Sequence, residues 1–298
     1  MKKRFPLQTM ALLAASGALF SGCLSQNPES PSAAAEKTDH PAMAAATTFA
    51  LNYGWQSIVQ ANPSSDVGAM IRTPGKCYAV GGVKFGNNYP IQVWDGAWDS
   101  YPHPSGAKGV GVDAAPDGSV WVVQDNKAIF SYPYNSSQAT YRGDAKDIGI
   151  GADGSVWKIG TQTIPGTNDY TISKWNGGSD WQTPVSGGGV RLDVDYQGRV
   201  WIVNSANEVW KMKSDMRTFS RVDGMYATDI GCGAQDGQIF AVSTQPYNSA
   251  GDSRIYHYVS GVTWESTNGG GYRVSVDNQG FPWLATKSGM AYNAYQKL

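Results

Sequence analysis

The chain is poor in charge and in the residues that build metal sites and disulfide scaffolds. Charged residues make up 16% of its 298 residues, and the formal net charge is −1. A near-neutral chain lacks the basic surface that nucleic acid requires, so nucleic acid is excluded as a partner. Three Cys cannot form a disulfide framework, and the three His are not spaced as metal ligands. We therefore expect no metal and no other cofactor.

Helical periodicity and catalytic motifs are also missing. No nucleophile elbow or phosphate-binding loop occurs. What the chain does have is 36 Gly and 35 aromatic residues. This aromatic content argues against disorder, and the glycines follow no collagen period. The composition indicates a folded protein rich in β-strands, and from the missing motifs we expect no enzymatic activity.

The N-terminus has the features of a secretion signal. Three cations at positions 2–4 precede an apolar stretch over 10–20, which is too short to span a bilayer permanently. Ser21 and Gly22 stand directly before Cys23, and this ending resembles the lipobox of bacterial lipoprotein signal peptides. The resemblance implies cleavage before Cys23 and lipidation of that residue. An ordinary secretory signal cut nearby is the alternative.

These features divide the chain into three parts. Residues 1–22 are the expected lipoprotein signal peptide, 23–48 an Ala-, Ser-, Pro- and Thr-rich flexible tether, and 49–298 the folded domain. The resemblance implies a lipid-anchored protein of the bacterial cell envelope that contacts the membrane through this anchor. Leu24 after the Cys is compatible with the outer membrane.

A repeat of about 41 residues covers the folded domain. It is clearest in Val-Asp-Tyr-Gln-Gly-Arg-Val-Trp at 194–201. Each copy contains short runs of alternating apolar and polar residues, and a polar-Gly pair separates the first two runs, as in tight hairpins. The copies end at Tyr78, Trp121, Trp157, Trp201, Phe240 and Trp283. Six units of four strands predict an all-β, six-bladed β-propeller of four-stranded blades.

The last unit has only three runs before the chain ends. The missing fourth run lies at 51–58, at the other end of the domain. We therefore expect the N-terminal strand to complete the C-terminal blade, which would remove an open sheet edge.

The segment 145–157, Ala-Lys-Asp-Ile-Gly-Ile-Gly-Ala-Asp-Gly-Ser-Val-Trp, followed by Ile-Ser-Lys-Trp-Asn-Gly at 172–177, resembles the tectonin repeat. That family includes horseshoe-crab, fish-egg and fungal lectins. The resemblance covers about 49–298 and implies a propeller that binds glycans, including bacterial surface sugars such as lipopolysaccharide and O-methylated sugars. Some members are interaction modules, so a scaffold for an envelope protein is the alternative function.

A second period is hidden in the first. Odd units have a long connection between second and third strands, and even units a short one. Odd units begin with Asp66, Asp147 or Asp229, where even units have Gly109, Arg191 or Arg273. Even units continue with Asp113, Asp195 or Asp277. This alternation predicts pseudo-threefold symmetry and, as a hypothesis, three equivalent binding sites.

The candidate site residues are aromatic, amide and cationic side chains at the predicted loops and third strands. An aromatic ring suits the apolar side of a sugar, and Asn and Arg supply hydrogen bonds. Core packing of the third-strand aromatics and solvation of the loops and cations are the alternatives. The candidates are Tyr89, Asn88, Trp94, Tyr170, Asn168, Trp175, Tyr247, Asn248, Tyr258, Arg191 and Arg273.

Two further expectations concern the interior. Cys77 and Cys232 occupy apolar positions of the repeat in units that are not neighbours, so we expect buried free thiols. A catalytic function would need a cluster of carboxylates or His at the central channel of the propeller.

Overall fold

The computed structural model describes residues 53–58, 64–70, 76–100, 107–134, 136, 138–178, 180–235, 238–289 and 291–297. The predicted signal peptide, Cys23 and the tether lie outside this range. The described residues form strands and loops and contain no helix, so none of their helices could cross a membrane.

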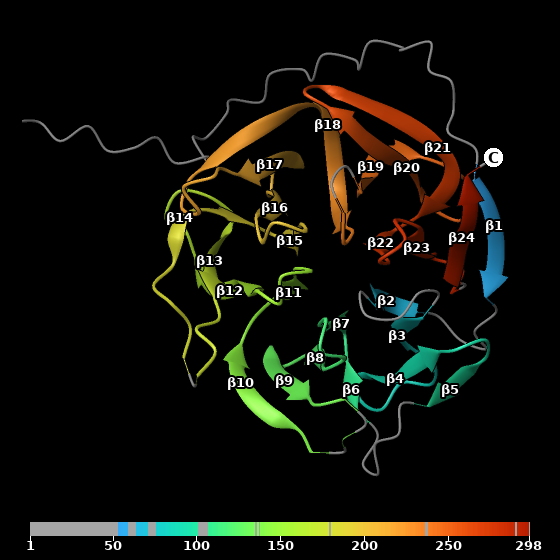
Figure 1. Cartoon of the computed structure of the whole chain (residues 1–298), viewed down its shortest axis with the longest axis horizontal. Coiled ribbons are helices and arrows are strands. Elements are labelled where there is room, and N and C mark those ends of the chain that lie inside the picture. Colours follow the sequence, from blue (N-terminus) through green and yellow to red (C-terminus); the bar gives the residue numbers. More distant parts are fainter. Residues whose placement is uncertain are drawn as a thin grey trace, which may run out of the picture.

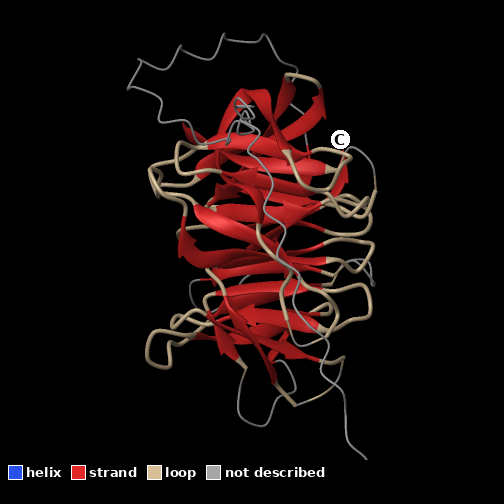
Figure 2. Cartoon of the chain, turned by 90° about the vertical axis from the view of Figure 1, so that its left-hand side faces the viewer, coloured by secondary structure: helices blue, strands red, loops and turns tan. Residues whose placement is uncertain are grey.

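The strands form antiparallel sheets that surround a central axis (Figure 1). Turned by 90°, the body shows strands through its middle and loops along two opposite faces (Figure 2). The first three sheets, each given from its innermost strand outward, are β2 (Ser64–Ala69), β3 (Cys77–Gly81), β4 (Tyr89–Trp94) and β5 (Trp98–Ser100), with β6 (Lys108–Gly109) also paired to β4; β7 (Gly111–Ala114), β8 (Val120–Val123), β9 (Ala128–Tyr132) and β10 (Thr140–Asp144); and β11 (Asp147–Ile150), β12 (Val156–Thr163), β13 (Tyr170–Lys174) and β14 (Val185–Gly189).

The rest of the ring consists of a seven-stranded sheet and a four-stranded one. The seven-stranded sheet contains β15 (Arg191–Val194), β16 (Val200–Val203), β17 (Glu208–Met212), β18 (Phe219–Cys232), β19 (Ile239–Pro246), β20 (Ser253–Ser260) and β21 (Thr263–Gly271). The last sheet contains β22 (Arg273–Val276), β23 (Pro282–Ala285), β24 (Ala291–Lys297) and β1 (Tyr53–Ile58).

The long strand β18 explains the seven-stranded sheet. Its first part, from Phe219 to Tyr226, pairs with β17, and its second part, from Ala227 to Cys232, pairs with β19. One continuous strand is therefore the outer strand of one four-stranded set and the innermost strand of the next.

The ring closes as the sequence predicted. β1 pairs antiparallel with β24, from Tyr53 opposite Lys297 to Ile58 opposite Ala291. The N-terminal strand therefore becomes the outermost strand of the C-terminal sheet, and the edge of β24 is covered.

The repeat residues build the core between sheets. Trp157, Trp201 and Trp283 at the repeat ends are 2%, 1% and 0% exposed. Both Cys77 and Cys232 are buried and free, which confirms their predicted place in the core.

The innermost strands show the predicted alternation. Every odd sheet has a Gly whose side would meet the backbone of the next sheet, because a Cβ there would lie close to a neighbouring Cα. These distances are 2.9 Å from Gly68 to Asp113, 2.8 Å from Gly149 to Asp193 and 3.2 Å from Gly231 to Ser275. Only a residue without a side chain allows this approach, which recurs three times around the ring.

One predicted correspondence was wrong. Asp113 pairs with Trp121, and the residues in the same register are Asp193 opposite Trp201 and Ser275 opposite Trp283. Asp195 and Asp277, which the sequence aligned with Asp113, lie two residues later. They accept hydrogen bonds from the indoles of Trp201 and Trp283, because the turn after β7 has a different length.

Candidate functional site

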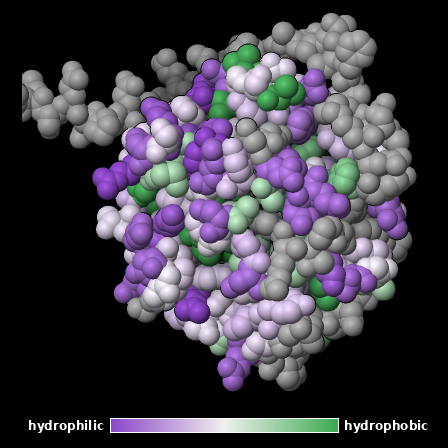
Figure 3. Space-filling model, viewed as in Figure 1, coloured by the Kyte–Doolittle hydropathy of each residue, from purple (hydrophilic) through white to green (hydrophobic). Residues whose placement is uncertain are grey.

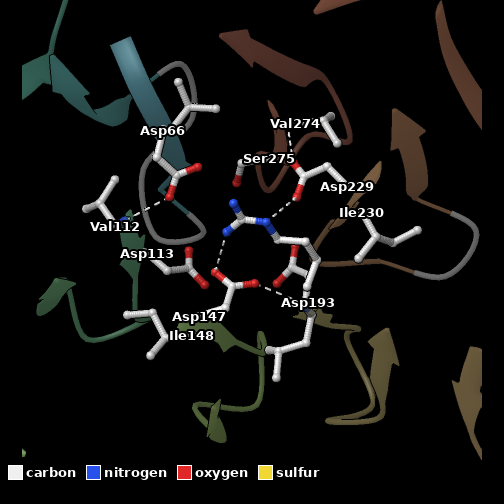
Figure 4. Close-up of a pocket in the computed structure, with 13 residues that line it drawn as sticks. Asp66, Val112, Asp113, Asp147, Ile148, Asp193, Asp229, Ile230, Val274 and Ser275 are labelled. Carbon is white, nitrogen blue, oxygen red and sulfur yellow. Dashed lines mark hydrogen bonds and ion pairs between the residues drawn. The ribbon is translucent and has the colours of Figure 1, made fainter. Parts of the chain in front are cut away.

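Five carboxylates line the central channel. They project inward from successive innermost strands (Figure 4). Each accepts a hydrogen bond from a backbone N–H of the next innermost strand, so every carboxylate joins two sheets. The pairs are Asp66 with Val112 (2.9 Å), Asp113 with Ile150 (2.7 Å), Asp147 with Leu192 (2.9 Å), Asp193 with Cys232 (2.7 Å) and Asp229 with Val274 (2.9 Å).

The sixth junction uses a hydroxyl group instead. The N–H of Ala69 donates to Oγ of Ser275 at 2.9 Å, and this bond completes the circle. The two arginines predicted to bind sugar lie here. Arg191 has Nη1 at 3.3 Å from Asp147 and Nε at 4.0 Å from Asp229, and Arg273 has Nε at 3.9 Å from Asp66. Their charges are directed at channel carboxylates.

Burial makes these carboxylates reluctant to ionise. It raises the pKa of Asp66 to about 7 and that of Asp113 to about 8. Burial also raises the pKa of Asp147, Asp193 and Asp229, and at Asp147 and Asp229 nearby Arg side chains oppose the rise. The cavity between them is about 30 Å³, roughly the volume of one water in the liquid. Among the described residues, no group of three acidic, His or Cys side chains could hold a metal.

The long odd connections, at one end of the ring, hold pairs of sheets together. We call this end, where second strands lead into third strands, the loop end. At each odd connection a side-chain oxygen accepts a hydrogen bond from a backbone N–H of the following even connection. The pairs are Asn88 with Asp125 (2.8 Å), Asp169 with Ser205 (2.6 Å) and Asp252 with Lys287 (2.7 Å). The predicted threefold relation therefore holds for the loop contacts.

The side chains beside these contacts differ among the three places. Phe85, Ile164 and Tyr247 correspond, because the N–H of each bonds to the carbonyl of Asn88, Asp169 or Asp252. At the first place Nζ of Lys108 lies 4.4 Å from the Phe85 ring centroid. At the third place the ring of Tyr247 lies against Gly270 and is 41% exposed. The three places therefore present different chemistry to solvent.

The third place contains a cleft between β21 and the closing sheet. Its volume is about 200 Å³, and we call it the Trp55–Tyr247 pocket. Two aromatic rings and amide, carboxylate and hydroxyl groups converge there. The lining residues are Trp55, Tyr247, Asn248, Asp252, Asn268, Gly269, Gly270, Leu284, Thr286 and Ser288.

Both aromatic walls are held by the end of β21. Oδ1 of Asn268 accepts hydrogen bonds from the N–H of Tyr53 at 2.9 Å and from Nε1 of Trp55 at 2.8 Å. The hydroxyl of Tyr247 donates to the Asn268 carbonyl at 3.0 Å. Without side chains, Gly269 and Gly270 make room for the two rings. The walls are therefore positioned before any ligand arrives.

The polar groups of the pocket are ordered as well. Nδ2 of Asn248 donates to Asp252 at 2.8 Å, and Asp252 is 2% exposed. Of the predicted residues, Tyr247 and Asn248 therefore come together in this pocket.

The other predicted residues lie elsewhere. Tyr89 and Tyr170 are half-buried against core clusters, with Lys84 and Lys146 over their rings at 4.9 and 3.7 Å. Asn88 is used in a loop contact, and Asn168 is exposed. These residues stay near the loop end but do not line the pocket.

The third-strand aromatics pack between sheets, which was the alternative interpretation. Trp175 lies 5.7 Å from Trp121, and Tyr258 lies 5.1 Å from Trp201, between ring centroids. Trp94 packs in the cluster that contains Trp283. Tyr258 also lines a separate cleft of about 290 Å³, beside Trp201, at the opposite end from the loops.

Sequence reasoning missed Trp55 and Asn268 as site residues. It used Trp55 only to place the closing strand. The closure itself was the one available signal, because it brings residue 55 next to the sheet of residues 263–271.

No family model matches the chain, and no curated protein does. Solved structures of β-propeller proteins do resemble it. A gluconolactonase from Xanthomonas campestris has a TM-score of 0.57 at 11% identity, covering 80% of this chain and 89% of that one. YCF48 bound to a D1 peptide has 0.54 at 12%, covering 84% and 100%. The SapL1 lectin in complex with alpha methyl fucoside has 0.53 at 11%, covering 78% and 93%.

These similarities establish the β-propeller fold. They also correct the prediction that the chain is not an enzyme, because a gluconolactonase, which is an enzyme, has the same fold. The missing sequence motifs misled that prediction, since a propeller gathers side chains from distant repeats. The central channel does contain the carboxylate cluster that the sequence analysis required of a catalytic propeller.

Proposed function

We propose that the protein is a six-bladed propeller of tectonin-like repeats that binds a saccharide in the Trp55–Tyr247 pocket. The six blades follow from counting β18 in two four-stranded sets. The observation that carries the function is the pair of aromatic walls, Trp55 and Tyr247, around a cleft of about 200 Å³ with convergent polar groups. Small-molecule sites have this form, in which apolar walls supply contact area and a few polar groups fix orientation.

The chemistry of the pocket suits a sugar. The apolar face of a sugar ring packs on an aromatic ring, and its hydroxyl groups exchange hydrogen bonds with amide and carboxylate oxygens. Asn248, Asp252, Thr286 and Ser288 supply such groups. The lectin with the same fold is bound to a fucoside, which supports a saccharide as the ligand.

The surface also favours a polar ligand. On the face shown in Figure 3, hydrophilic residues predominate among those described, and hydrophobic ones are scattered. A large partner protein usually requires a continuous apolar patch. YCF48, a propeller bound to a peptide, is the reason to keep protein binding as an outcome of the test.

A glycan array tests this function. It should include lipopolysaccharides and O-methylated sugars. We expect binding by the purified chain and its loss in Tyr247→Ala and Trp55→Ala, with folding checked by circular dichroism. Tyr134→Ala is the matched control, because Tyr134 is 50% exposed and does not line the pocket. Absence of binding to every glycan, with capture of an envelope protein, would replace the saccharide by a protein partner.

We also propose that the mature protein is anchored in the bacterial cell envelope through lipid on Cys23. The N-terminal sequence is the basis for this proposal. Fatty-acid labelling of cells that express the chain should label it, and Cys23→Ala should abolish the label. Labelling that persists in the variant would contradict the proposal.

A further inference from the structure

The loop end carries cations that make no ion pair with any described residue. Second-to-third connections and crossings between sheets lie at the same end of the ring, because consecutive strands are antiparallel. Elsewhere, Arg191, Arg199, Arg221 and Arg273 each lie within 4.0 Å of a carboxylate. The unpaired cations of the loop end are Lys84, Lys108, Lys127, Lys146, Arg254 and Lys287.

Carboxylates at the loop end are mostly withdrawn from its surface. Asp169 and Asp252 are 1% and 2% exposed, and both accept hydrogen bonds from backbone N–H groups. Asp125 is half-buried and accepts from the Asn87 amide at 2.9 Å. The opposite end instead presents exposed carboxylates in its turns, at Asp117, Asp153, Asp180 and Asp215. A nearly neutral chain therefore has an uneven distribution of exposed charge.

Two of these cations flank the Trp55–Tyr247 pocket. The guanidinium carbon of Arg254 lies 5.9 Å from the centroid of the Tyr247 ring. Lys287 gives its N–H to Asp252, and its side chain runs beside Gly251. Both side chains are exposed, so neither is consumed by the fold.

We infer that the saccharide bound in this pocket is anionic, with carboxylate or phosphate groups on its sugars. The inference rests on the proposed function and specifies its ligand. A guanidinium forms paired hydrogen bonds with a carboxylate or phosphate, and the further cations around the ring attract a chain that bears repeated negative charges. A neutral sugar would use the aromatic walls and leave this charge without a partner.

Matched glycans isolate the effect of charge. Oligogalacturonate and its fully methyl-esterified form share one sugar chain and differ in carboxylate charge. We expect the acid to bind about tenfold more tightly than the ester at low salt. We expect the difference to shrink near 1 M salt, where the screening length is about 3 Å. Phosphorylated and unphosphorylated mannan form the second arm, which identifies phosphate as the anion if only that arm responds.

Charge-neutralising variants locate the effect. The double variant Arg254→Gln/Lys287→Gln should lose most of the preference for the acid. Lys213→Gln/Arg217→Gln removes two exposed cations at the opposite end and should retain the preference. An unchanged preference in the first variant would overturn the role of these two side chains.

The outcomes separate this inference from the proposed function. Equal binding of charged and uncharged forms in both arms would overturn the anionic ligand and leave saccharide binding intact. Binding of an acid that survives Trp55→Ala and Tyr247→Ala would support the anionic ligand and reject the pocket. Failure of these and all other glycans to bind would overturn both.

Discussion

Trp55 and Asn268 lie 213 positions apart in the sequence, yet Nε1 of Trp55 donates a 2.8 Å hydrogen bond to Oδ1 of Asn268. The same amide bonds both backbone polar groups of Tyr53, through Oδ1 to the N–H and through Nδ2 to the carbonyl, each at 2.9 Å. One side chain therefore fastens the closing strand and positions a wall of the proposed site.

Replacing Asn268 should weaken ring closure and ligand binding together. Asn268→Ala removes three hydrogen bonds, and we expect a loss of about 1–3 kcal/mol in the free energy of unfolding. Urea denaturation measures this loss, and faster amide exchange in 53–58 would locate it. Asn176→Ala is the control, because Asn176 is exposed and accepts one local bond from Gly178. Equal stability of the two variants would contradict the closure role.

Gly270 offers a way to separate binding from stability. A Cβ at this position would lie 2.0 Å from the Tyr247 ring, which is 41% exposed and can swing into solvent. We expect Gly270→Ala to displace the ring and weaken saccharide binding at least about tenfold, while the melting temperature changes little. Gly178→Ala is the control, because its Cβ would meet only the Asn176 side chain at 3.4 Å. Full binding by Gly270→Ala would exclude Tyr247 from the site.

Arg191 should matter for stability and not for saccharide binding. It lies in the channel, 3.3 Å from Asp147 and 4.0 Å from Asp229. Arg191→Gln leaves buried carboxylates without their cation, which should cost about 3–5 kcal/mol at neutral pH. The loss should be smaller at pH 5, where those carboxylates accept protons more readily. Thermal melts at the two pH values, combined with the glycan assay, test both parts; loss of binding in a folded variant would return Arg191 to the ligand site.

The channel carboxylates should make the protein less stable as pH rises. Burial raises the pKa of Asp113 to about 8 from its usual 3.8. Between these two values the folded chain holds a proton that the unfolded chain has released, so the free energy of unfolding falls as pH increases. The slope approaches about 1.4 kcal/mol per pH unit for one such group.

Urea denaturation at pH 5, 6, 7 and 8 measures this slope. Asp113→Asn removes the titrating proton and should flatten the curve. Asp117→Asn, at an exposed turn, should leave the curve as it is. Stability that rises from pH 5 to pH 8 in the parent chain would contradict the assignment.

Local repetition made much of the fold readable. Trp157, Trp201 and Trp283 occupy equivalent positions, and their burial followed from that equivalence. The missing fourth run located the closing strand for the same reason, because each sheet needs four strands. The alignment failed at Asp195, where a change in turn length shifted the register and concealed Asp193 as the counterpart of Asp113.

The site was readable only in part. Tyr247 and Asn248 were found because a long polar loop with an aromatic residue stands out locally. Arg191 was placed among ligand residues, since sequence does not show which cations face a carboxylate. Trp175 and Tyr258 were left with two interpretations that only packing could separate.

The sequence by itself determined the repeating strands, the order of the sheets and the closure by the first strand, because these depend on periodicities within each repeat. The tertiary structure decided what the repeats bring together. Asp66 joins Val112 at the channel, and Trp55 meets Tyr247 at the pocket, through contacts between separate sheets. Such contacts depend on how whole sheets pack around the axis, and a local pattern does not specify that packing.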